Sequence, residues 1–522
     1  MNFISRKALY IILVIAAGTG VIAGCVITFP ENELAELPPE GETSQPPGLS
    51  NSPHPPAATI IPPKVTVPPT RQPGQPILTP TPDNQRMLPK LRDTEETYTV
   101  SAGDTLSIIA KGFGVTVAML IEANGIADPN LLDVGQQLLI PAPVPNGSSP
   151  AYKIIPDSEL VYGPMTVFFD PAAFIAEKGG YLSDYSEEVD EIQLSGGEIV
   201  TRVSREFSVN PKLLLAVLEY QSGWVSSKNP DPYFIDYPAG YPDSNRKGLW
   251  RQLTWAANQL NFGYYTWKAN VLSAYFLPDG NIILPTTTLN AGTVGVQYFF
   301  SQLFDREKWE SVTTSGGFNA TYQQLFGYAF DQAIEPLVPS DLEQPIMQLP
   351  FEDKATWSFT GGPHGGWGDG SAWAALDFAP PGETAGCVPN NAWVTASAPG
   401  LVVRSNNGVV VIDLDFDGYE QTGWSLLYLH MASQDRIAAG SIVSPGDRIG
   451  HPSCEGGLSS GTHVHLARRY NGEWIEATGA IPFLLDGWFA EPANEEYDGY
   501  LVKDGYVIEA WDSRKPENQI HR

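Results

Sequence analysis

Hydrophobic positions recur at two different spacings and divide the chain into a helical part and a β-rich part. Apolar residues follow the three-to-four spacing of amphipathic helices over residues 198–207, 211–221, 250–265 and 289–304. Further along, short apolar runs alternate with glycines, as in strands, over residues 393–397, 401–404, 409–414, 425–430 and 463–467. The pattern predicts a mainly helical middle domain followed by an all-β domain.

The first residues have the pattern of a targeting signal. Arg6 and Lys7 precede an apolar run, residues 8–21, that is shorter than the ~20 residues of a spanning helix and suits a signal peptide. The run ends at Cys25 in Val-Ile-Ala-Gly-Cys, which resembles the bacterial lipobox. The resemblance implies a signal peptide over residues 1–25 and a lipid on Cys25. A plain signal peptide or an uncleaved anchor are the alternatives.

Residues 26–95 are predicted to form a disordered tether. Proline pairs recur there among Ser, Thr and Glu, a composition that cannot bury a core and favours extended polyproline conformations. At ~3.1 Å per residue the tether reaches on the order of 100–200 Å. That length would carry a domain from a membrane into wall material.

Residues 96–143 have a strand–helix–helix–strand pattern. Tyr98 begins a strand-like run, Asp104 is the expected helix N-cap, and Asn124-Gly125 marks a turn. The ends of the segment resemble a LysM module, which begins Y-x-V-x-x-G-D-T-L and ends near G-Q-x-L-x-I-P. The resemblance implies a small βααβ module that binds glycans containing N-acetylglucosamine. Its expected contacts lie on two loops, at Gly103, Asp104, Thr105, Asn130 and Leu131.

Charge and length limit the classes of function. The 522 residues exceed one hydrophobic core and predict about three domains. Lys and Arg number 30 against 59 Asp and Glu, so the formal net charge is −29. A nucleic-acid-binding protein needs a basic footprint, which this composition argues against. An acidic surface favours solubility and leaves sugar binding possible.

The middle domain, residues 151–345, carries a local motif with one substitution. Residues 209–217, followed by Ser222-Gly223-Trp224, resemble the lysozyme-like lytic transglycosylases, which place a catalytic Glu directly before Ser-Gly. Gln221 stands there instead, and an amide cannot donate the proton that glycosidic cleavage needs. Glu219 lies two residues earlier and points elsewhere on a helix. We expect an inactive lysozyme-like scaffold. Activity through Glu219 and a purely structural spacer are the alternatives.

Histidines concentrate in the β domain, residues 346–490, at His364, His430, His451, His463 and His465. Side chains alternate along a strand, so His463 and His465 face the same side. Asp377 is a lone acid in an apolar strand, and a buried carboxylate needs a partner such as a metal. Zinc takes His nitrogen and carboxylate oxygen and keeps one position for water in catalytic sites. The pattern favours a metal site.

These motifs resemble the lysostaphin-type zinc endopeptidases, which have a duplicated-hybrid-motif β-sandwich. The family shows H-x-G-x-D-[FIL]-A-x-P-G, Y-x-H-[LM] and G-x-H-[LV]-H in this order. The chain offers, in the same order, His364 with Asp377-Phe378-Ala379, then Tyr428-Leu429-His430-Met431, then Gly461-Thr462-His463-Val464-His465. The resemblance implies that Zn²⁺ is held by His364, Asp377 and His465. It implies that His430 and His463 are catalytic, one taking a proton from the attacking water and the other stabilising the oxyanion. Which histidine has which role stays open.

One departure concerns the first two ligands, which the family usually separates by three residues. Here residues 365–376 intervene, and we expect a Gly- and Trp-rich loop between ligands that stay neighbours. Asp369 is a rival ligand without the Phe-Ala-Pro context. His451 is expected in a loop, and Glu455 and residues 459–462 are expected at the edge of the cleft.

Cys387 and Cys454 are left when Cys25 is assigned to the lipid. Outside the cytoplasm they are expected to form a disulfide, and two unpaired buried thiols are the alternative. Residues 491–522 are predicted to be a C-terminal extension.

The combined expectation is an extracytoplasmic, lipid-anchored cell-wall hydrolase. It would bind peptidoglycan, contact the membrane through its lipid, and cut peptide cross-links as a zinc endopeptidase. The first alternative is a non-catalytic peptidoglycan-binding or amidase-activating wall protein, the role of several relatives that have lost ligands. The second is a glycan-strand lyase acting through the middle domain, which Gln221 argues against.

Overall fold

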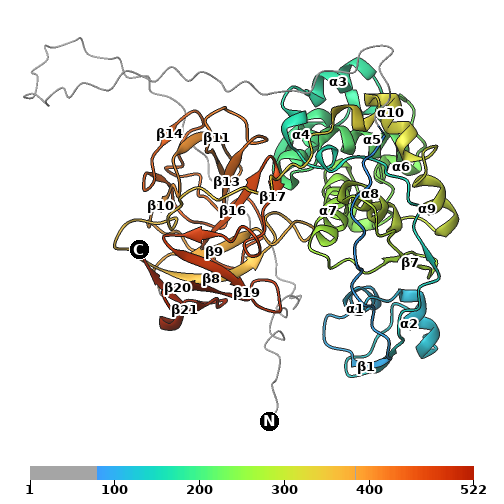
Figure 1. Ribbon diagram of the computed structural model, residues 1–522, viewed down its shortest axis with the longest axis horizontal. Helices are drawn as coiled ribbons and strands as arrows, with labels where there is room; N and C mark the ends of the chain where they lie inside the picture. Colours follow the sequence, from blue (N-terminus) through green and yellow to red (C-terminus); the bar gives the residue numbers. More distant parts are fainter. Residues whose placement is uncertain (1–78, 383) are drawn as a thin grey trace, which may run out of the picture. The chain divides into compact units, whose positions relative to one another are not determined.

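The computed structural model describes residues 79–382 and 384–522 (Figure 1). The predicted signal peptide, Cys25 and most of the predicted tether lie outside these residues. Within the described residues, no helix combines the length and hydropathy needed to cross a membrane.

The end of the predicted tether is bound to the middle domain. Lys153 Nζ lies 2.7 Å from Asp83 Oδ1, and the Arg86 guanidinium stacks 5.0 Å from the centroid of the Trp267 ring. The prediction of a disordered tether up to residue 95 is therefore wrong for this stretch, because an ion pair and a cation–π contact fix it.

The βααβ module forms as predicted. It consists of β1 (Glu96–Thr99), α1 (Leu106–Phe113), α2 (Val117–Asn124) and β2 (Gln137–Ile140), with β1 and β2 antiparallel. Leu106, Ile109 and Leu120 are buried in its core.

The expected N-cap of α1 is wrong. Thr105 Oγ1 accepts the N–H of Ile108 and caps the helix. The Asp104 carboxylate instead accepts from the Ser101 N–H and the Tyr98 hydroxyl, closing the turn before the helix.

The middle domain is helical, and each predicted helical stretch is present. The predicted stretches correspond to α4 (Gly196–Phe207), α5 (Pro211–Ser222), α7 (Leu249–Lys268) and α8 (Ala291–Ser301). Local chemistry sets their starts: Ser195 and Glu198 form a capping box on α4, and Pro211 follows the Asn210 cap on α5. Figure 1 shows α3 (Pro171–Lys178) to α10 (Phe318–Phe326) gathered in one body.

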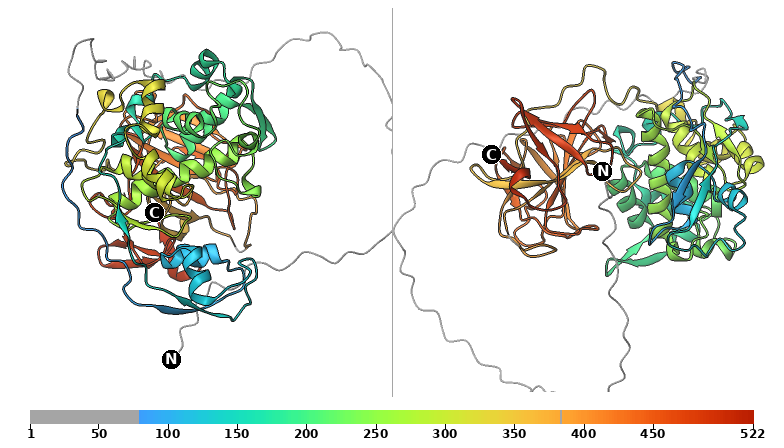
Figure 2. Two further views of the ribbon diagram at one scale, coloured as in Figure 1. Left: turned by 90° about the vertical axis from the view of Figure 1, so that its right-hand side faces the viewer. Right: turned by 90° about the horizontal axis from the view of Figure 1, so that it is seen from below.

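The C-terminal domain is built on one large antiparallel sheet, which lies beside the helical domain (Figure 2, right). The strands along it are β14 (Ile442–Val443), β11 (Gly400–Asn406), β12 (Val409–Asp413), β13 (Trp424–Leu429), β16 (Val464–Tyr470), β9 (Ala375–Ala379), β8 (Thr356–His364) and β22 (Gln519–His521). The all-β prediction is confirmed, and β8, β9 and β16 are neighbours near one end of this sheet.

The last residues belong to the same domain. Residues 491–522 contribute β20 (Gly499–Lys503), β21 (Tyr506–Glu509) and β22, and β20 pairs with β19 (Trp488–Pro492). Since β22 pairs with β8, the segment predicted as an extension is an integral part of the β domain.

The helical and β domains share one hydrophobic core. The hairpin of β16 and β17 (Glu473–Trp474) carries Trp474 into the helical domain, where this side chain is 1% exposed. The indole Nε1–H donates to the Phe207 carbonyl at 3.3 Å, and the Tyr264 hydroxyl donates to Glu473 Oε2 at 3.0 Å. The two domains are therefore expected to unfold together.

Replacing Trp474 by Ala should weaken this coupling. Loss of a buried aromatic side chain costs about 3–5 kcal/mol, and here the loss falls on the contact between domains. Differential scanning calorimetry should give one shared transition for the wild-type helical and β domains and two transitions for Trp474→Ala. The control is Trp357→Ala, which removes a tryptophan buried in the β domain, 2% exposed. Two separate wild-type transitions would contradict the coupling.

Candidate metal centre

Three neighbouring strands bring the predicted ligands together. His364 is the last residue of β8, Asp377 lies in the middle of β9, and His465 lies on β16. His465 is the register partner of Asp377, and the bulged pairing of β8 with β9 carries His364 to the same place. Residues distant along the chain thus lie side by side on three adjacent strands.

The three side chains present one atom each to a common point. His364 Nε2 lies 3.2 Å from Asp377 Oδ1, and His465 Nδ1 lies 3.3 Å from the same oxygen. The two nitrogens are 2.9 Å apart. His364 is 1% exposed and the other two are each 6% exposed, so water does not screen these groups.

Backbone carbonyls orient both imidazoles. His364 Nδ1 lies 2.7 Å from the Gly362 carbonyl oxygen, and His465 Nε2 lies 3.1 Å from that of Gly366. An N–H must donate to each carbonyl, so in the neutral rings the other two nitrogens face each other with lone pairs. Buried lone pairs at this separation need a proton or a cation between them.

The donor set fits zinc. Asp377 Oδ1 is buried and has no hydrogen-bond partner among the described residues. Two imidazole nitrogens and one carboxylate oxygen are ligands that zinc accepts, at about 2.0–2.2 Å each. Their mutual spacing of 2.9 to 3.3 Å matches what bonds of that length produce around one ion.

Electrostatics favour a single positive charge in the cluster. Burial alone would raise the pKa of the Asp377 carboxyl, but the imidazoles of His364 and His463 hold it well below its usual range. Burial also opposes the charged form of His364, yet the Asp377 carboxylate outweighs it and raises the pKa of His364. Burial lowers the pKa of His465. In the metal-free protein the proton therefore belongs on His364.

Two further histidines lie beside this cluster. His463 Nε2 is 3.6 Å from Asp377 Oδ2, and the rings of His430 and His463 are 4.5 Å apart between centroids. The Nδ1 of His430 lies 3.0 Å from the Glu455 carbonyl oxygen, and that of His463 lies 2.7 Å from the Gly461 oxygen. In each ring Nε2 is therefore the nitrogen that does not face a backbone carbonyl. Burial, with His463 and His465 nearby, lowers the pKa of His430 to about 3.

The Cys387–Cys454 disulfide is present and lies next to these residues. Cys454 precedes Glu455, whose carbonyl orients His430. The bridge therefore ties the loop that supports His430 to the loop at residue 387.

The rival candidates lie elsewhere. Asp369 is exposed and is not part of the His364–Asp377–His465 cluster. His451 packs on the Trp393 ring at 3.9 Å between centroids and bonds to the Ala392 carbonyl. Among the residues that the structure describes, neither Asp369 nor His451 contacts His364, Asp377 or His465.

Tyr497 was missed by sequence reasoning. Its ring stacks on the His364 imidazole, with centroids 4.2 Å apart, and is 52% exposed. It comes from the loop between β19 and β20, in the segment predicted as an extension. No motif or spacing marks it, because backbone hydrogen bonds of Tyr497 with Gly362 and Pro363 bring this loop to β8.

The loop between the first two ligands contacts the helical domain. The Gly370 N–H donates to Asn258 Oδ1 on α7 at 2.9 Å, and the Trp367 and Phe207 rings meet at 6.5 Å. A Cβ on Gly370 would lie 2.1 Å from the Asn258 carbonyl oxygen, so glycine is required for this approach. Gly366, which orients His465, belongs to the same loop.

The middle domain does not form an acid site at its transglycosylase-like motif. Glu219 Oε2 accepts the N–H groups of Val225 and Ser226 at 3.2 and 3.0 Å, so this carboxylate stabilises the turn after α5. Gln221 lies against Gly240. Neither residue is arranged as a free general acid.

The predicted glycan contacts lie on two exposed loops of the βααβ module. Gly103 adopts a φ of +94°, which suits glycine, and Leu131 is 73% exposed. The Asn130 side chain donates to Asp128 Oδ1 at 3.1 Å.

Three parts of the chain match models of known families. Residues 98–141 match the LysM domain, residues 153–337 match the N-terminal domain of LasA, and residues 382–477 match peptidase family M23. The chain is therefore multidomain, with a LysM domain, a helical LasA-type region and a β-rich M23 domain. The lysozyme-like character of the middle domain stays a prediction.

The chain is also similar to individual proteins. Protease LasA of Pseudomonas aeruginosa (strain UCBPP-PA14) is 25% identical over 341 residues, which are 62% of this chain and 75% of that protein. The beta-lytic metalloendopeptidase of Achromobacter lyticus is 30% identical over 173 residues, 31% of this chain and 43% of that protein. The solved structure of the M23 metalloprotease pseudoalterin is 26% identical, covers 34% of this chain and 99% of its own, and has a TM-score of 0.29.

Proposed function

We propose that this protein is a zinc-dependent metalloendopeptidase that cleaves peptide cross-links of peptidoglycan. The observation that carries the proposal is the complete donor triangle of His364, Asp377 and His465, with two further imidazoles beside it. The matched relatives, which are named a protease and a metalloendopeptidase, support the same reaction class.

In this proposal His364, Asp377 and His465 hold the zinc ion. Zinc supplies a Lewis acid that polarises a peptide carbonyl and acidifies water. The Gly362 and Gly366 carbonyls fix the ring orientations, so the ligands are organised before the metal arrives.

The two remaining histidines have different surroundings, which suggests different roles. His430 donates its Nδ1–H to the Glu455 carbonyl and presents an Nε2 lone pair, so this ring is placed to accept a proton from the attacking water. His463 Nε2 lies 3.6 Å from Asp377 Oδ2, beside the ligand cluster. This position suits His463 to stabilise the oxyanion.

The other parts of the chain would deliver this domain to its substrate. Gly103, Asp104, Thr105, Asn130 and Leu131 would contact glycan, and a lipid on Cys25 would anchor the protein to the membrane through the tether. The disulfide agrees with an extracytoplasmic location. The acidic charge argues against nucleic acid as a partner. The proposed subfold of the peptidase domain is the lysostaphin-type β-sandwich.

A non-catalytic wall-binding or amidase-activating protein is the second candidate. It is disfavoured because all five positions of the expected metal and catalytic set are filled and adjacent. A lyase acting through the middle domain is disfavoured by the bonds that occupy Glu219.

Replacing His465 by Ala should remove zinc and peptidase activity together, since one of three ligands is lost. Metal content and the release of free amines from purified peptidoglycan measure the two effects. His451→Ala is the matched control and should keep both. A His465→Ala protein with unchanged zinc content would exclude His465 from the ligand set.

Zinc affinity should fall with acidification. The raised pKa of His364 means that this ring takes up a proton at a higher pH than an ordinary histidine, and zinc must displace that proton. Below that pKa the affinity is expected to fall about ten-fold per pH unit, and activity should fall below about pH 6. Chelator competition between pH 5 and 8 measures the first effect. A flat affinity across this range would contradict the proton–zinc competition.

Asn258 should influence zinc binding although it lies in the helical domain. Asn258→Ala removes the acceptor of the Gly370 N–H and frees the loop whose Gly366 carbonyl orients His465. Loss of such supporting bonds typically costs ~10–100-fold in metal affinity, and we expect about ten-fold here.

Two variants control the Asn258 experiment. Asn258→Asp keeps an oxygen acceptor and should recover most of the affinity. Gln252→Ala removes a buried amide from the same helix, where it bonds only to the helical domain at Tyr241 and Arg246. Equal zinc affinities of Asn258→Ala and Gln252→Ala would show that the loop contact has no specific effect.

A further inference from the structure

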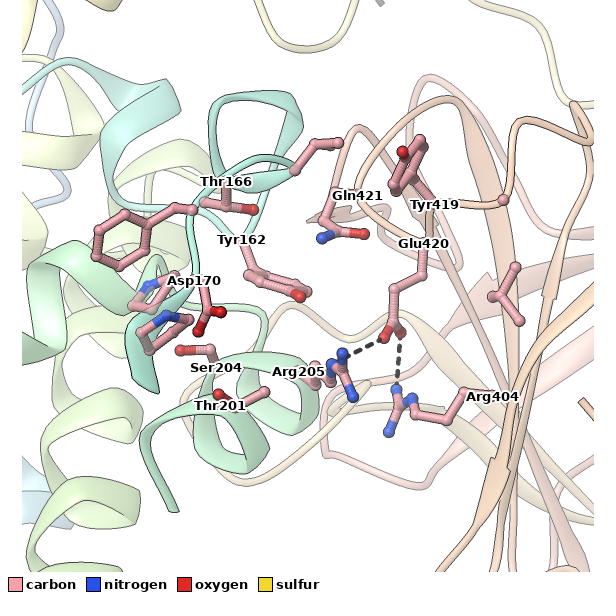
Figure 3. A pocket seen from close by; sticks show the side chains of 16 residues that line it. Tyr162, Thr166, Asp170, Thr201, Ser204, Arg205, Arg404, Tyr419, Glu420 and Gln421 are labelled. Atoms are coloured by element: carbon pink, nitrogen blue, oxygen red, sulfur yellow. Dashed lines mark hydrogen bonds and ion pairs between the residues drawn. The ribbon is translucent and has the colours of Figure 1, made fainter. Parts of the chain in front are cut away.

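A polar pocket lies between the helical and β domains (Figure 3). Its volume is about 410 Å³, within the ~300–1,000 Å³ of typical ligand pockets. One face of α4 supplies the helical wall with Ser204 and Arg205, and Arg404 and Glu420 lie on the β wall. None of the lining residues belongs to the histidine cluster, so this is a separate site.

Three guanidinium groups surround one carboxylate, that of Glu420, where the two walls meet. Glu420 Oε2 accepts hydrogen bonds from Arg404 at 2.9 Å and from Arg469 at 2.7 Å, and Arg205 Nε lies 3.9 Å from Oε1. The Glu420 and Arg404 side chains are 6% and 8% exposed, and Arg469 is fully buried. Burial alone would raise the pKa of Glu420, but Arg404 and Arg469 lower it to about 2. One carboxylate thus serves three guanidinium groups.

The acids on the helical side of the pocket already have partners. Asp170, on the helical wall, accepts the N–H groups of Ala172 and Ala173 at the start of α3. Glu206 pairs with Arg202 at 2.9 Å, and Asp190 pairs with the same arginine. The guanidinium groups of Arg205, Arg404 and Arg469 share the single carboxylate of Glu420, so an added anion would be favourable beside them.

Two buried donors at the pocket also lack acceptors. Ser204 Oγ is fully buried and Arg404 Nε is buried beside Glu420, and neither has a hydrogen-bond partner among the described residues. A buried donor without an acceptor is unfavourable by about 1–3 kcal/mol. The oxygens of an anion that enters the pocket would act as acceptors for donors such as the Ser204 hydroxyl and Arg404 Nε.

We propose that this interdomain pocket binds a small oxyanion, a carboxylate or a phosphate group. Arg205 is the accessible cation, since its side chain is 47% exposed while the other two guanidinium groups lie deeper. Tyr162 and Tyr419 add aromatic surface for the apolar part of an organic anion (Figure 3). The site does not depend on zinc or on peptidase activity.

Isothermal titration calorimetry on the full chain at low ionic strength tests this assignment. The probes are N-acetylalanine, which carries a carboxylate, its uncharged amide, and inorganic phosphate. We expect saturable binding of at least one anion and at least about ten-fold weaker binding of the amide, because charge-assisted hydrogen bonds are lost. Binding of N-acetylalanine alone would identify a carboxylate ligand, and binding of phosphate alone a phosphate ligand.

Variants locate the binding. Arg205→Gln should lower the affinity for the anion by at least about ten-fold, and Ser204→Ala should lower it about three-fold or more. Glu420 keeps Arg404 and Arg469 in Arg205→Gln, so folding should be preserved. The control is Arg251→Gln, which removes an arginine of α7 that donates to the Asn245 carbonyl and should leave binding unchanged. Absence of saturable anion binding, or equal affinity in wild type and Arg205→Gln, would overturn the proposal.

Discussion

The mutual repulsion of three electron-rich atoms is the constraint on which the site depends. Asp377 Oδ1 and two imidazole nitrogens lie within 3.3 Å of one another, away from water. The Gly362 and Gly366 carbonyls prevent either ring from turning its N–H inward without losing a bond. The arrangement is stable only with positive charge at its centre. A protonated His364 supplies that charge in the metal-free protein, and a metal ion would replace the proton.

The fold meets this constraint with elements from both domains. Pairing of β16 with β9 sets His465 opposite Asp377, and the bulges between β8 and β9 bring in His364. The loop that carries Gly366 leaves the sheet and is fixed on α7 through Asn258. Trp474, in the hairpin that follows β16, also contacts the helical domain through its hydrogen bond to the Phe207 carbonyl. The middle domain is therefore more than a spacer, because it supports a loop that orients a predicted ligand.

The sequence alone was sufficient for features that depend on residues close together in the chain. Alternation along a strand places His463 and His465 on one face, and a lone acid in the apolar run 375–379 marks Asp377 as needing a partner. The sequence was not sufficient where two residues compete for one structural role, or where segments distant in the chain pack together. Thr105 and Asp104 are both good helix caps, and only the position of Tyr98 decides between them. Tyr497 and Asn258 reach the site through backbone hydrogen bonds with β8 and through the domain contact, which leave no periodic signal.

The charge distribution gives the interdomain pocket its selectivity. The chain as a whole carries a formal charge of −29, so an approaching anion is repelled at long range. Repulsion between exposed charges is screened within about 10 Å at ordinary ionic strength, whereas guanidinium groups beside a low-dielectric core act with little screening. An oxyanion would therefore be attracted only at the pocket, where Arg205 and its buried arginine neighbours lie. The surface charge and the pocket together favour binding at one defined place over general adhesion.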